Sequence, residues 1–131
     1  MANTVNITTV NDGPRNICIH VYIASDGASG DITDQVLIDP ADYGLPSTTR
    51  FGVQGIEYNF SGMSARIEFD SGLVDDNLIW VLGENNSSAD LDRVGGLVDR
   101  SGLDGTGKIQ ITTTGLSSLG DEGSLLLCVR K

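Results

Sequence analysis

Regular alternation of apolar and polar residues is the feature that most constrains the fold of this chain. It is clearest between Met63 and Asp70, where every second residue is apolar. A period of two places one set of side chains on each face of a β-strand. The segment is therefore predicted to be a strand with one face on a core and the other in solvent. Its apolar positions are Met63, Ala65, Ile67 and Phe69.

Similar segments recur along the 131 residues, separated by turns rich in Gly, Asp, Ser and Asn. Their spacing is typical of β-sandwiches and barrels, and no segment with a helical period reaches a normal helix length. We expect one domain over residues 1–131, an all-β antiparallel β-sandwich or jelly-roll-like barrel of about eight strands. The expected strands cover residues 5–10, 16–24, 35–39, 50–60, 63–70, 78–82, 108–113 and 124–129.

Local signals predict how some of these strands are connected. Ser61 and Gly62 form a short link of the kind found in β-hairpins, so the two strands that they join are expected to pair. Asp39 followed by Pro40 is a helix N-cap with a proline at the first helical position, which indicates one helical turn.

Two strands are expected to be buried. Residues 16–24 carry apolar side chains on one face, and Cys18 and His20 lie on the other, which favours a central strand covered on both sides. Residues 78–82 are continuously apolar and contain Trp80, the single tryptophan, which is expected to anchor the core.

The composition argues against several classes of partner. The formal net charge is −10, and only 8 residues are Lys or Arg. Nucleic acids and anionic membranes are bound by clustered basic residues, so neither is expected as a partner. The first four residues lack the basic and apolar regions of a signal peptide, and no apolar run approaches the length of a membrane span. We therefore expect a soluble protein made in the cytoplasm.

No enzymatic activity is expected. A Ser–His–Asp triad or a Cys–His catalytic pair would have to use His20, the single histidine. His20 lies in the middle of an expected strand, so it is expected to be a partly buried structural residue. A retaining glycosidase needs two carboxylates about 5 Å apart. Glu57 and Glu68 would face each other in this way if their strands formed a hairpin. An exposed sheet face with few aromatic residues is a poor sugar site, however.

No cofactor is expected either. The loop acids Asp26, Asp31 and Asp34 are weak calcium candidates, because carboxylates in Asp- and Gly-rich loops bind this ion, but they do not match an EF-hand. Residues 102–108 superficially match a phosphate-binding loop, yet Ile109 follows the lysine and no helix begins there.

The two cysteines, Cys18 and Cys128, both lie in expected strands. Two thiols cannot form a zinc site unaided. Buried free thiols are favoured over a disulfide in a reducing compartment. Pairing of the first long strand with the last would bring them close, so the disulfide stays an open alternative.

Two segments are expected to contact partners. Residues 1–4 are predicted to be a flexible arm, and residues 83–107 are predicted to be a long polar, glycine-rich loop, since loops of that length are usually functional or mobile. The candidate partner-binding residues are Asn3, Thr4, Asn85, Asn86, Asp90, Asp92 and Arg93.

Three stretches carry a resemblance to a known class of proteins: ITTVNDGPRN at 7–16, GMSARIEFD at 62–70 and GDEGSLLLCVRK at 120–131. With them the chain resembles the small virion structural proteins of tailed bacteriophages, of the head decoration or cement kind. The resemblance implies a compact β fold without cofactors, made in the host cytoplasm and located in the virion. It also implies binding to the major capsid protein on the outer head surface, reinforcement of contacts between capsomers, and a homo-oligomer, either dimer or trimer.

Two other classes remain open. One is a tail or head–tail adaptor component of the same virion, which would form a ring from the same scaffold. The other is a carbohydrate- or receptor-binding β module. Sugar-binding modules usually expose aromatic platforms, whereas aromatic residues make up 5% of this chain and mostly occupy expected core positions.

Overall fold

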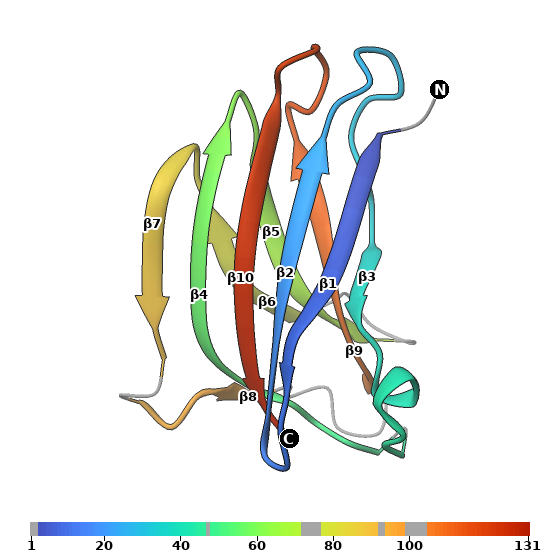
Figure 1. Ribbon diagram of the computed structural model, residues 1–131, viewed down its shortest axis with the longest axis vertical. Coiled ribbons are helices and arrows are strands. Elements are labelled where there is room, and N and C mark those ends of the chain that lie inside the picture. Colours follow the sequence, from blue (N-terminus) through green and yellow to red (C-terminus); the bar gives the residue numbers. More distant parts are fainter. Residues whose placement is uncertain (1–2, 47, 72–76, 92–93, 99–104) are drawn as a thin grey trace.

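The computed structural model describes residues 3–46, 48–71, 77–91, 94–98 and 105–131. These residues form ten β-strands and one short 3-10 helix (Figure 1). The elements in chain order are β1 (Thr4–Asp12), β2 (Asn16–Ala24), β3 (Gln35–Ile38), η1 (Pro40–Tyr43), β4 (Gly52–Ser61), β5 (Ser64–Ser71), β6 (Asn77–Leu82), β7 (Asn85–Asp90), β8 (Leu97–Val98), β9 (Gly105–Thr114) and β10 (Glu122–Arg130).

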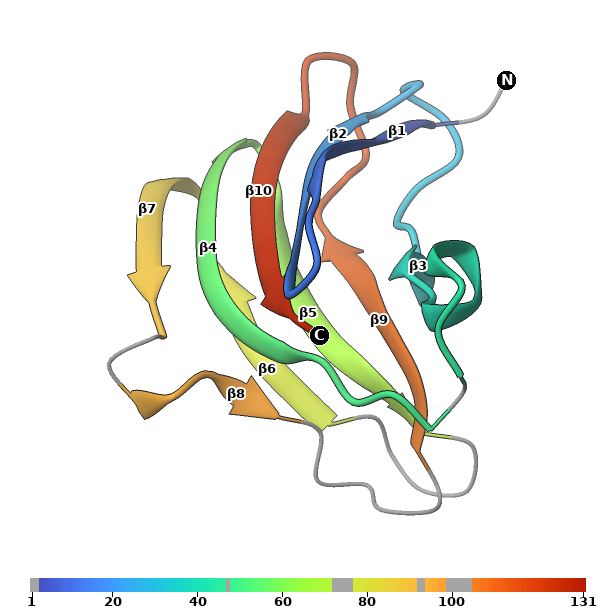
Figure 2. The same ribbon diagram turned by 60° about the horizontal axis from the view of Figure 1, so that its bottom comes forward.

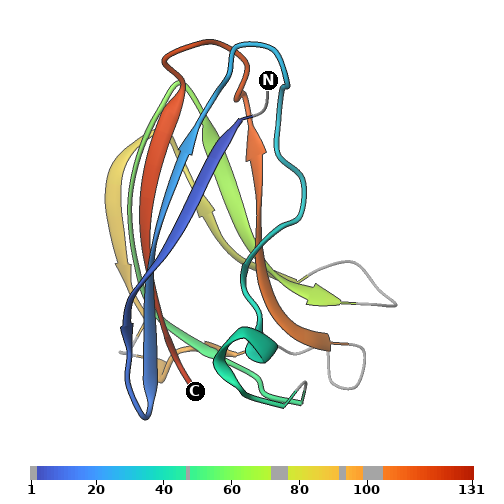
Figure 3. The same ribbon diagram turned by 45° about the vertical axis from the view of Figure 1, so that its right-hand side comes forward.

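The strands form two antiparallel sheets. The larger sheet has the order β1-β2-β10-β4-β7, with β8 pairing the beginning of β4, and the smaller sheet has the order β3-β9-β5-β6. Figure 3 shows the two sheets as separate layers, and Figure 2 shows β1 and β3 on the side of the molecule opposite β7. The predicted all-β sandwich is confirmed. Each sheet ends in edge strands, so the two sheets do not close into one barrel.

The core lies between the two layers and contains the alternate residues that the periodicity predicted. In β5, Ala65, Ile67 and Phe69 are buried, and Met63 just before the strand is buried with them. The apolar sets of β2, β4, β9 and β10 face them from both sheets. Burial of such side chains contributes about 1.5–3 kcal/mol each, which makes this interlayer contact the main stabilising feature.

The link at Ser61 and Gly62 does not form a hairpin. β4 pairs with β10 and β7 in the larger sheet, whereas β5 pairs with β9 and β6 in the smaller one. The link therefore carries the chain from one layer to the other. Gly62 has a φ of +75°, and a Cβ there would overlap the Asp121 side chain, so the turn requires glycine for both conformation and space.

The segment 83–107 is not one long loop. Residues 85–90 form β7, residues 97–98 form β8, and β9 already begins at Gly105. The prediction failed because β7 has the sequence NNSSAD, which lacks any apolar alternation. As an edge strand it packs against the core only through Ala89, so its other side chains need not alternate.

The two strands expected to be buried are less covered than predicted. β2 does lie inside the larger sheet, between β1 and β10, but its second face is solvent-accessible, with Cys18 half-buried and His20 exposed. β6 is an edge strand, and Trp80 on it is 37% exposed. Trp80 is therefore not the predicted core anchor.

The helical turn after β3 is confirmed. The Asp39 carboxylate accepts a hydrogen bond from the Ala41 amide at 3.0 Å, and Pro40 occupies the first helical position. The pairing of β4 with β10 also shifts its register beside Gly55.

Candidate functional site

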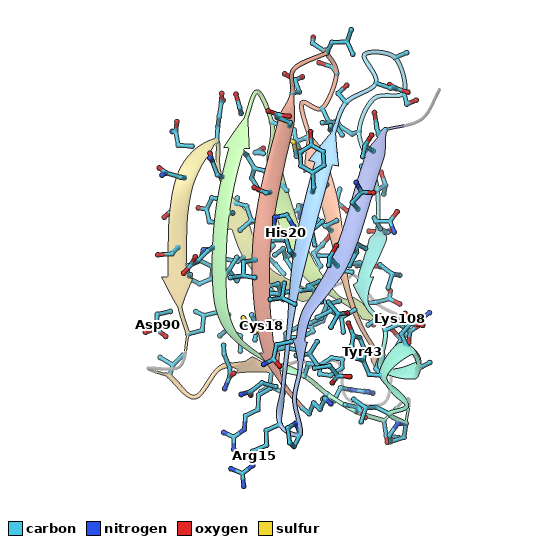
Figure 4. The ribbon with its side chains drawn as sticks, viewed as in Figure 1. Arg15, Cys18, His20, Tyr43, Asp90 and Lys108 are labelled. Atoms are coloured by element: carbon cyan, nitrogen blue, oxygen red, sulfur yellow. A yellow bond between two sulfur atoms is a disulfide. The ribbon has the colours of Figure 1, made fainter. Side chains whose placement is uncertain are left out.

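The outer face of the larger sheet presents rows of polar side chains across β2, β10, β4 and β7. Residues directly opposite one another on antiparallel strands project from the same face. Leu126 lies opposite His20 on one side and Glu57 on the other, and Glu57 lies opposite Ser88. Figure 4 shows His20 and Cys18 on this face. The next row contains Tyr22, Ser124, Asn59 and Asn86.

This face is hollowed along β10. A hollow of about 600 Å³ lies over its middle, lined by residues of β2, β10, β4 and β7. A second hollow of about 350 Å³ shares Glu57 and Leu126 with it, and a third of about 130 Å³ shares Asn59 and Ser124. The three hollows therefore adjoin one another along β10. We call this feature the β10 groove.

Most polar side chains of the β10 groove are unused within the protein. Those without a side-chain hydrogen bond to any other described residue include His20, Glu57, Asn59, Asn86, Ser88 and Ser124. At one end, by contrast, the Tyr22 hydroxyl donates a hydrogen bond to Glu122 Oε2 at 2.8 Å. That bond and the nearby negative charge raise the pKa of Tyr22 above its ordinary value. The groove thus combines a fixed tyrosine with a set of donors and acceptors that are open to solvent.

His20 differs from its prediction. It is exposed on the outer face of β2, not partly buried. Its neighbour on this face, Cys18, has no thiol to offer as a nucleophile, because it forms a disulfide with Cys128. The Cys18 and His20 pair therefore has no Cys–His chemistry in this state.

The disulfide corrects the favoured prediction of free thiols. Cys18 and Cys128 are directly opposite on β2 and β10, with a Cα–Cα distance of 4.1 Å. The open alternative is therefore the observed one: the first long strand, β2, pairs with the last strand, β10, and this pairing brings the two sulfurs together. The bond forms part of the floor at one end of the β10 groove.

The loop acids are structural in the places where the structure describes them. Asp26 accepts hydrogen bonds from the Ser29 hydroxyl and from the Ser29 and Ala28 amides, which lower its pKa to about 2. Asp31 accepts from the Leu116 amide at 2.8 Å. These calcium candidates do not converge, and within the described ranges no three acidic, histidine or cysteine side chains form a metal-binding group.

Asp34 and Asp121 follow the same pattern. Asp34 Oδ1 accepts from the Thr112 hydroxyl at 3.2 Å, and the Asp121 carboxylate accepts from the amides of Ser117 and Ser118. The two amides lower the pKa of Asp121, the Ser118 amide most. Each carboxylate therefore organises a loop at the end of the sandwich instead of facing a shared ligand.

Residues 1–2 of the predicted flexible arm lie outside the described chain, whereas residues 3 and 4 are attached to the domain. Asn3 Nδ2 donates to the Gly30 carbonyl at 2.7 Å, and Asn3 Oδ1 accepts from the Asp26 amide at 3.0 Å. Thr4 is the first residue of β1 and lies opposite Ala24. Both residues therefore stabilise the fold, which leaves them poorly placed as a free docking segment.

The other candidate partner-binding residues fall into two groups. Asn85, Asn86 and Asp90 lie on β7, and all three are exposed. Asn86 contributes to the β10 groove, and Asp90 lies at its disulfide end. Asp92 and Arg93 lie outside the described residues.

The remaining sequence candidates do not come together. Glu57 lies on the outer face of the larger sheet, whereas Glu68 belongs to β5 in the smaller sheet, where it is buried and paired with Arg66 at 3.1 Å. They cannot form a glycosidase pair across one hairpin. Lys108 lies on β9 and its ammonium is 3.9 Å from Asp39, so it is a strand residue as expected; residues 102–104 lie outside the described chain.

A second exposed feature was missed by the sequence analysis. Strand β6 exposes Leu78 by 51%, Trp80 by 37% and Val81 by 59%, although Ile79 and Leu82 on the same strand are buried. Within the described chain, β6 pairs only with β5. We call Leu78, Trp80 and Val81 the β6 edge. A continuous apolar run does not reveal whether its strand lies inside a sheet or at its margin, so the sequence held no signal for this exposure.

Comparison with known protein families, with curated proteins and with solved structures finds no match. Among the described residues, no helix is long and apolar enough to cross a membrane. The functional inference therefore rests on the β10 groove, the β6 edge and the resemblance of the sequence.

Proposed function

We propose that this chain is a non-enzymatic structural protein of a tailed-bacteriophage virion, a capsid decoration or cement protein. It would bind the major capsid protein on the outer head surface and reinforce contacts between capsomers. The resemblance of three sequence stretches suggests the class. The observation that carries the proposal is the β6 edge, because it suits binding to another protein.

The β6 edge has two properties of a protein-binding surface. Trp80, with Leu78 and Val81 beside it, supplies the aromatic and aliphatic anchors that are enriched at interfaces. An edge strand also offers backbone donors and acceptors to a partner strand. A head surface repeats the same partner many times, so even a weak single contact would give firm attachment if the chain is a dimer or trimer.

A direct test uses heads of the parent phage that lack this chain. Purified protein is mixed with them, and binding is measured by co-sedimentation over a range of concentrations. The variant Trp80→Ser/Val81→Ser is compared with Leu119→Ser, which changes a residue that is 76% exposed in the loop before β10. Circular dichroism confirms that both variants are folded.

We expect the wild type and Leu119→Ser to bind heads equally. Removal of an interface anchor costs about 2 kcal/mol, so the double variant is expected to bind more than about tenfold more weakly. Failure of the wild type to bind heads would overturn the proposal. Electron microscopy that places the chain on the tail, together with a ring-sized mass in solution, would assign it instead to the tail or head–tail adaptor.

A further inference from the structure

The β10 groove has open hydrogen-bonding capacity that the proposed function does not use. Several of the polar side chains that line it bond to no other described residue, and together they offer both donors and acceptors. The amides of Asn59 and Asn86 donate and accept, and the Glu57 carboxylate accepts. A hydroxyl group also donates and accepts at once, so a ligand rich in hydroxyls can satisfy many of these groups together.

The charge of the groove selects among ligands. Glu57 and Glu122 line it, and none of the described residues that line it is Lys or Arg. A phosphate, sulfate or uronic acid would meet unfavourable Coulomb energy from Glu57 and Glu122, and no Lys or Arg among the described lining residues offsets it. Neutral ligands carry no such penalty.

The groove also offers apolar surface at separated positions. Leu126 lies at its centre, Tyr22 at one end and the Cys18–Cys128 disulfide at the other. Tyr22 is held in place by its hydrogen bond to Glu122, so its ring is already oriented. Binding sites for small ligands combine such apolar contacts with a few fixed polar groups. Pyranose rings have the matching character, with hydroxyls at the rim and C–H groups on the faces.

A peptide is a less suitable ligand for this face. Extended peptides add to sheets at their edges, where unpaired backbone groups bind them. The groove runs over β10, which is paired on both sides, with β2 and β4. The groove therefore offers side chains and not unpaired backbone groups to a ligand, which favours a ligand other than a peptide.

We propose that the β10 groove binds a neutral glycan, with Glu57, Asn59 and Asn86 bonding to its hydroxyls and with Tyr22 and Leu126 packing against its sugar rings. This is a binding activity separate from attachment through the β6 edge, which lies on the other sheet. The groove is shallow and has few aromatic side chains, so it is a weaker sugar site than one with an aromatic platform, and the expected affinity for a short oligosaccharide is only in the millimolar range.

Nuclear magnetic resonance titration of the labelled full chain tests the proposal. The probes are neutral hexasaccharides of glucose, galactose, mannose and N-acetylglucosamine, with hexagalacturonate and hexalysine as charged comparisons. We expect at least one neutral hexasaccharide to shift amide resonances of β2, β4, β7 and β10. The variants are Asn59→Ala/Asn86→Ala, and Thr114→Ala as a matched control at an exposed position on β9 of the smaller sheet.

The groove variant is expected to lose about tenfold or more in affinity, because both deleted amides would hydrogen-bond to the glycan, whereas Thr114→Ala is expected to bind as the wild type does. Three results would overturn the proposal: no shift with any neutral probe at millimolar concentration, equal binding by the groove variant, or tighter binding of hexagalacturonate or hexalysine. None of these results bears on head binding, so the two proposals fail independently.

Discussion

The ring of Phe60 occupies the space in which Gly123 would carry a side chain. The two residues lie opposite each other on β4 and β10, and both are buried on the inner face of the larger sheet. A Cβ placed on Gly123 would overlap the Phe60 ring. A glycine in a strand interior is normally unfavourable, and here its cost is offset by the aromatic ring that packs over it.

Gly123→Ala is therefore expected to destabilise the protein. Overpacking of a core costs about 1–3 kcal/mol, because Phe60 has to leave its rotamer or the strands have to separate. The free energy of unfolding in urea measures the loss. Gly55→Ala is the matched control, since its Cβ would lie 3.8 Å from the nearest atom, an ordinary contact on the outer face. Equal effects of the two variants would contradict the packing argument.

Loss of the disulfide is expected to destabilise the native state strongly. Cys18 and Cys128 are separated by 110 residues, and closing a loop of about 100 residues stabilises by about 4.7 kcal/mol in the chain-entropy treatment. Cys18→Ala/Cys128→Ala is expected to lower the melting temperature, as dithiothreitol does for the wild type. The reductant should have no effect on the double variant. A wild type whose melting is unaffected by full reduction would show that the bond contributes little.

Acid is expected to weaken the loop held by Asp26. Its pKa in the folded state, about 2, lies below the ordinary value of 3.8, so its contribution is present above pH 4. It is lost as the pH falls from about 4 towards 2, since the protonated carboxyl accepts hydrogen bonds more weakly. Asp26→Ala should therefore be less stable than the wild type at pH 7, and the difference should shrink at pH 2.

Urea unfolding at pH 7, 4 and 2 provides the measurement for Asp26. Asp42→Ala serves as the control, because the Asp42 carboxylate accepts no hydrogen bond from the described residues. A difference between wild type and Asp26→Ala that stays constant across this range would refute the assignment.

Ile111 and Val81 are expected to respond in opposite ways to truncation. Ile111 on β9 is fully buried, and Ile→Ala at such a site costs about 2–5 kcal/mol through lost burial and the cavity left behind. Val81 on the β6 edge is 59% exposed, so Val81→Ala should change stability by less than about 0.5 kcal/mol. The urea midpoints of unfolding of the two variants, compared with that of the wild type, test these two expectations. A large loss at Val81 would mean that the edge is part of the core and not a free surface.

Residue periodicity predicted much of the fold. Alternation at Met63–Asp70 correctly identified which side chains of β5 face the core, and the Asp39–Pro40 pair correctly predicted the turn after β3. These signals depend on neighbours within a few residues, so the sequence reports them directly. The polar strand β7 gave no such signal, because an edge strand without a covered face has no reason to alternate.

Sequence alone determined that this chain is an all-β domain whose inner strands each have one apolar face, and only the structure showed that its sheets form an open sandwich. Only the tertiary structure decided which strands are neighbours: that Ser61 and Gly62 lead into the opposite sheet, that β2 pairs with β10 and so joins Cys18 to Cys128, and that Trp80 lies on an edge. The β10 groove depends on that order, since its residues come from four strands. A period of two shows which side chains share a face of one strand, but partners far along the chain are selected by the packing of the whole core.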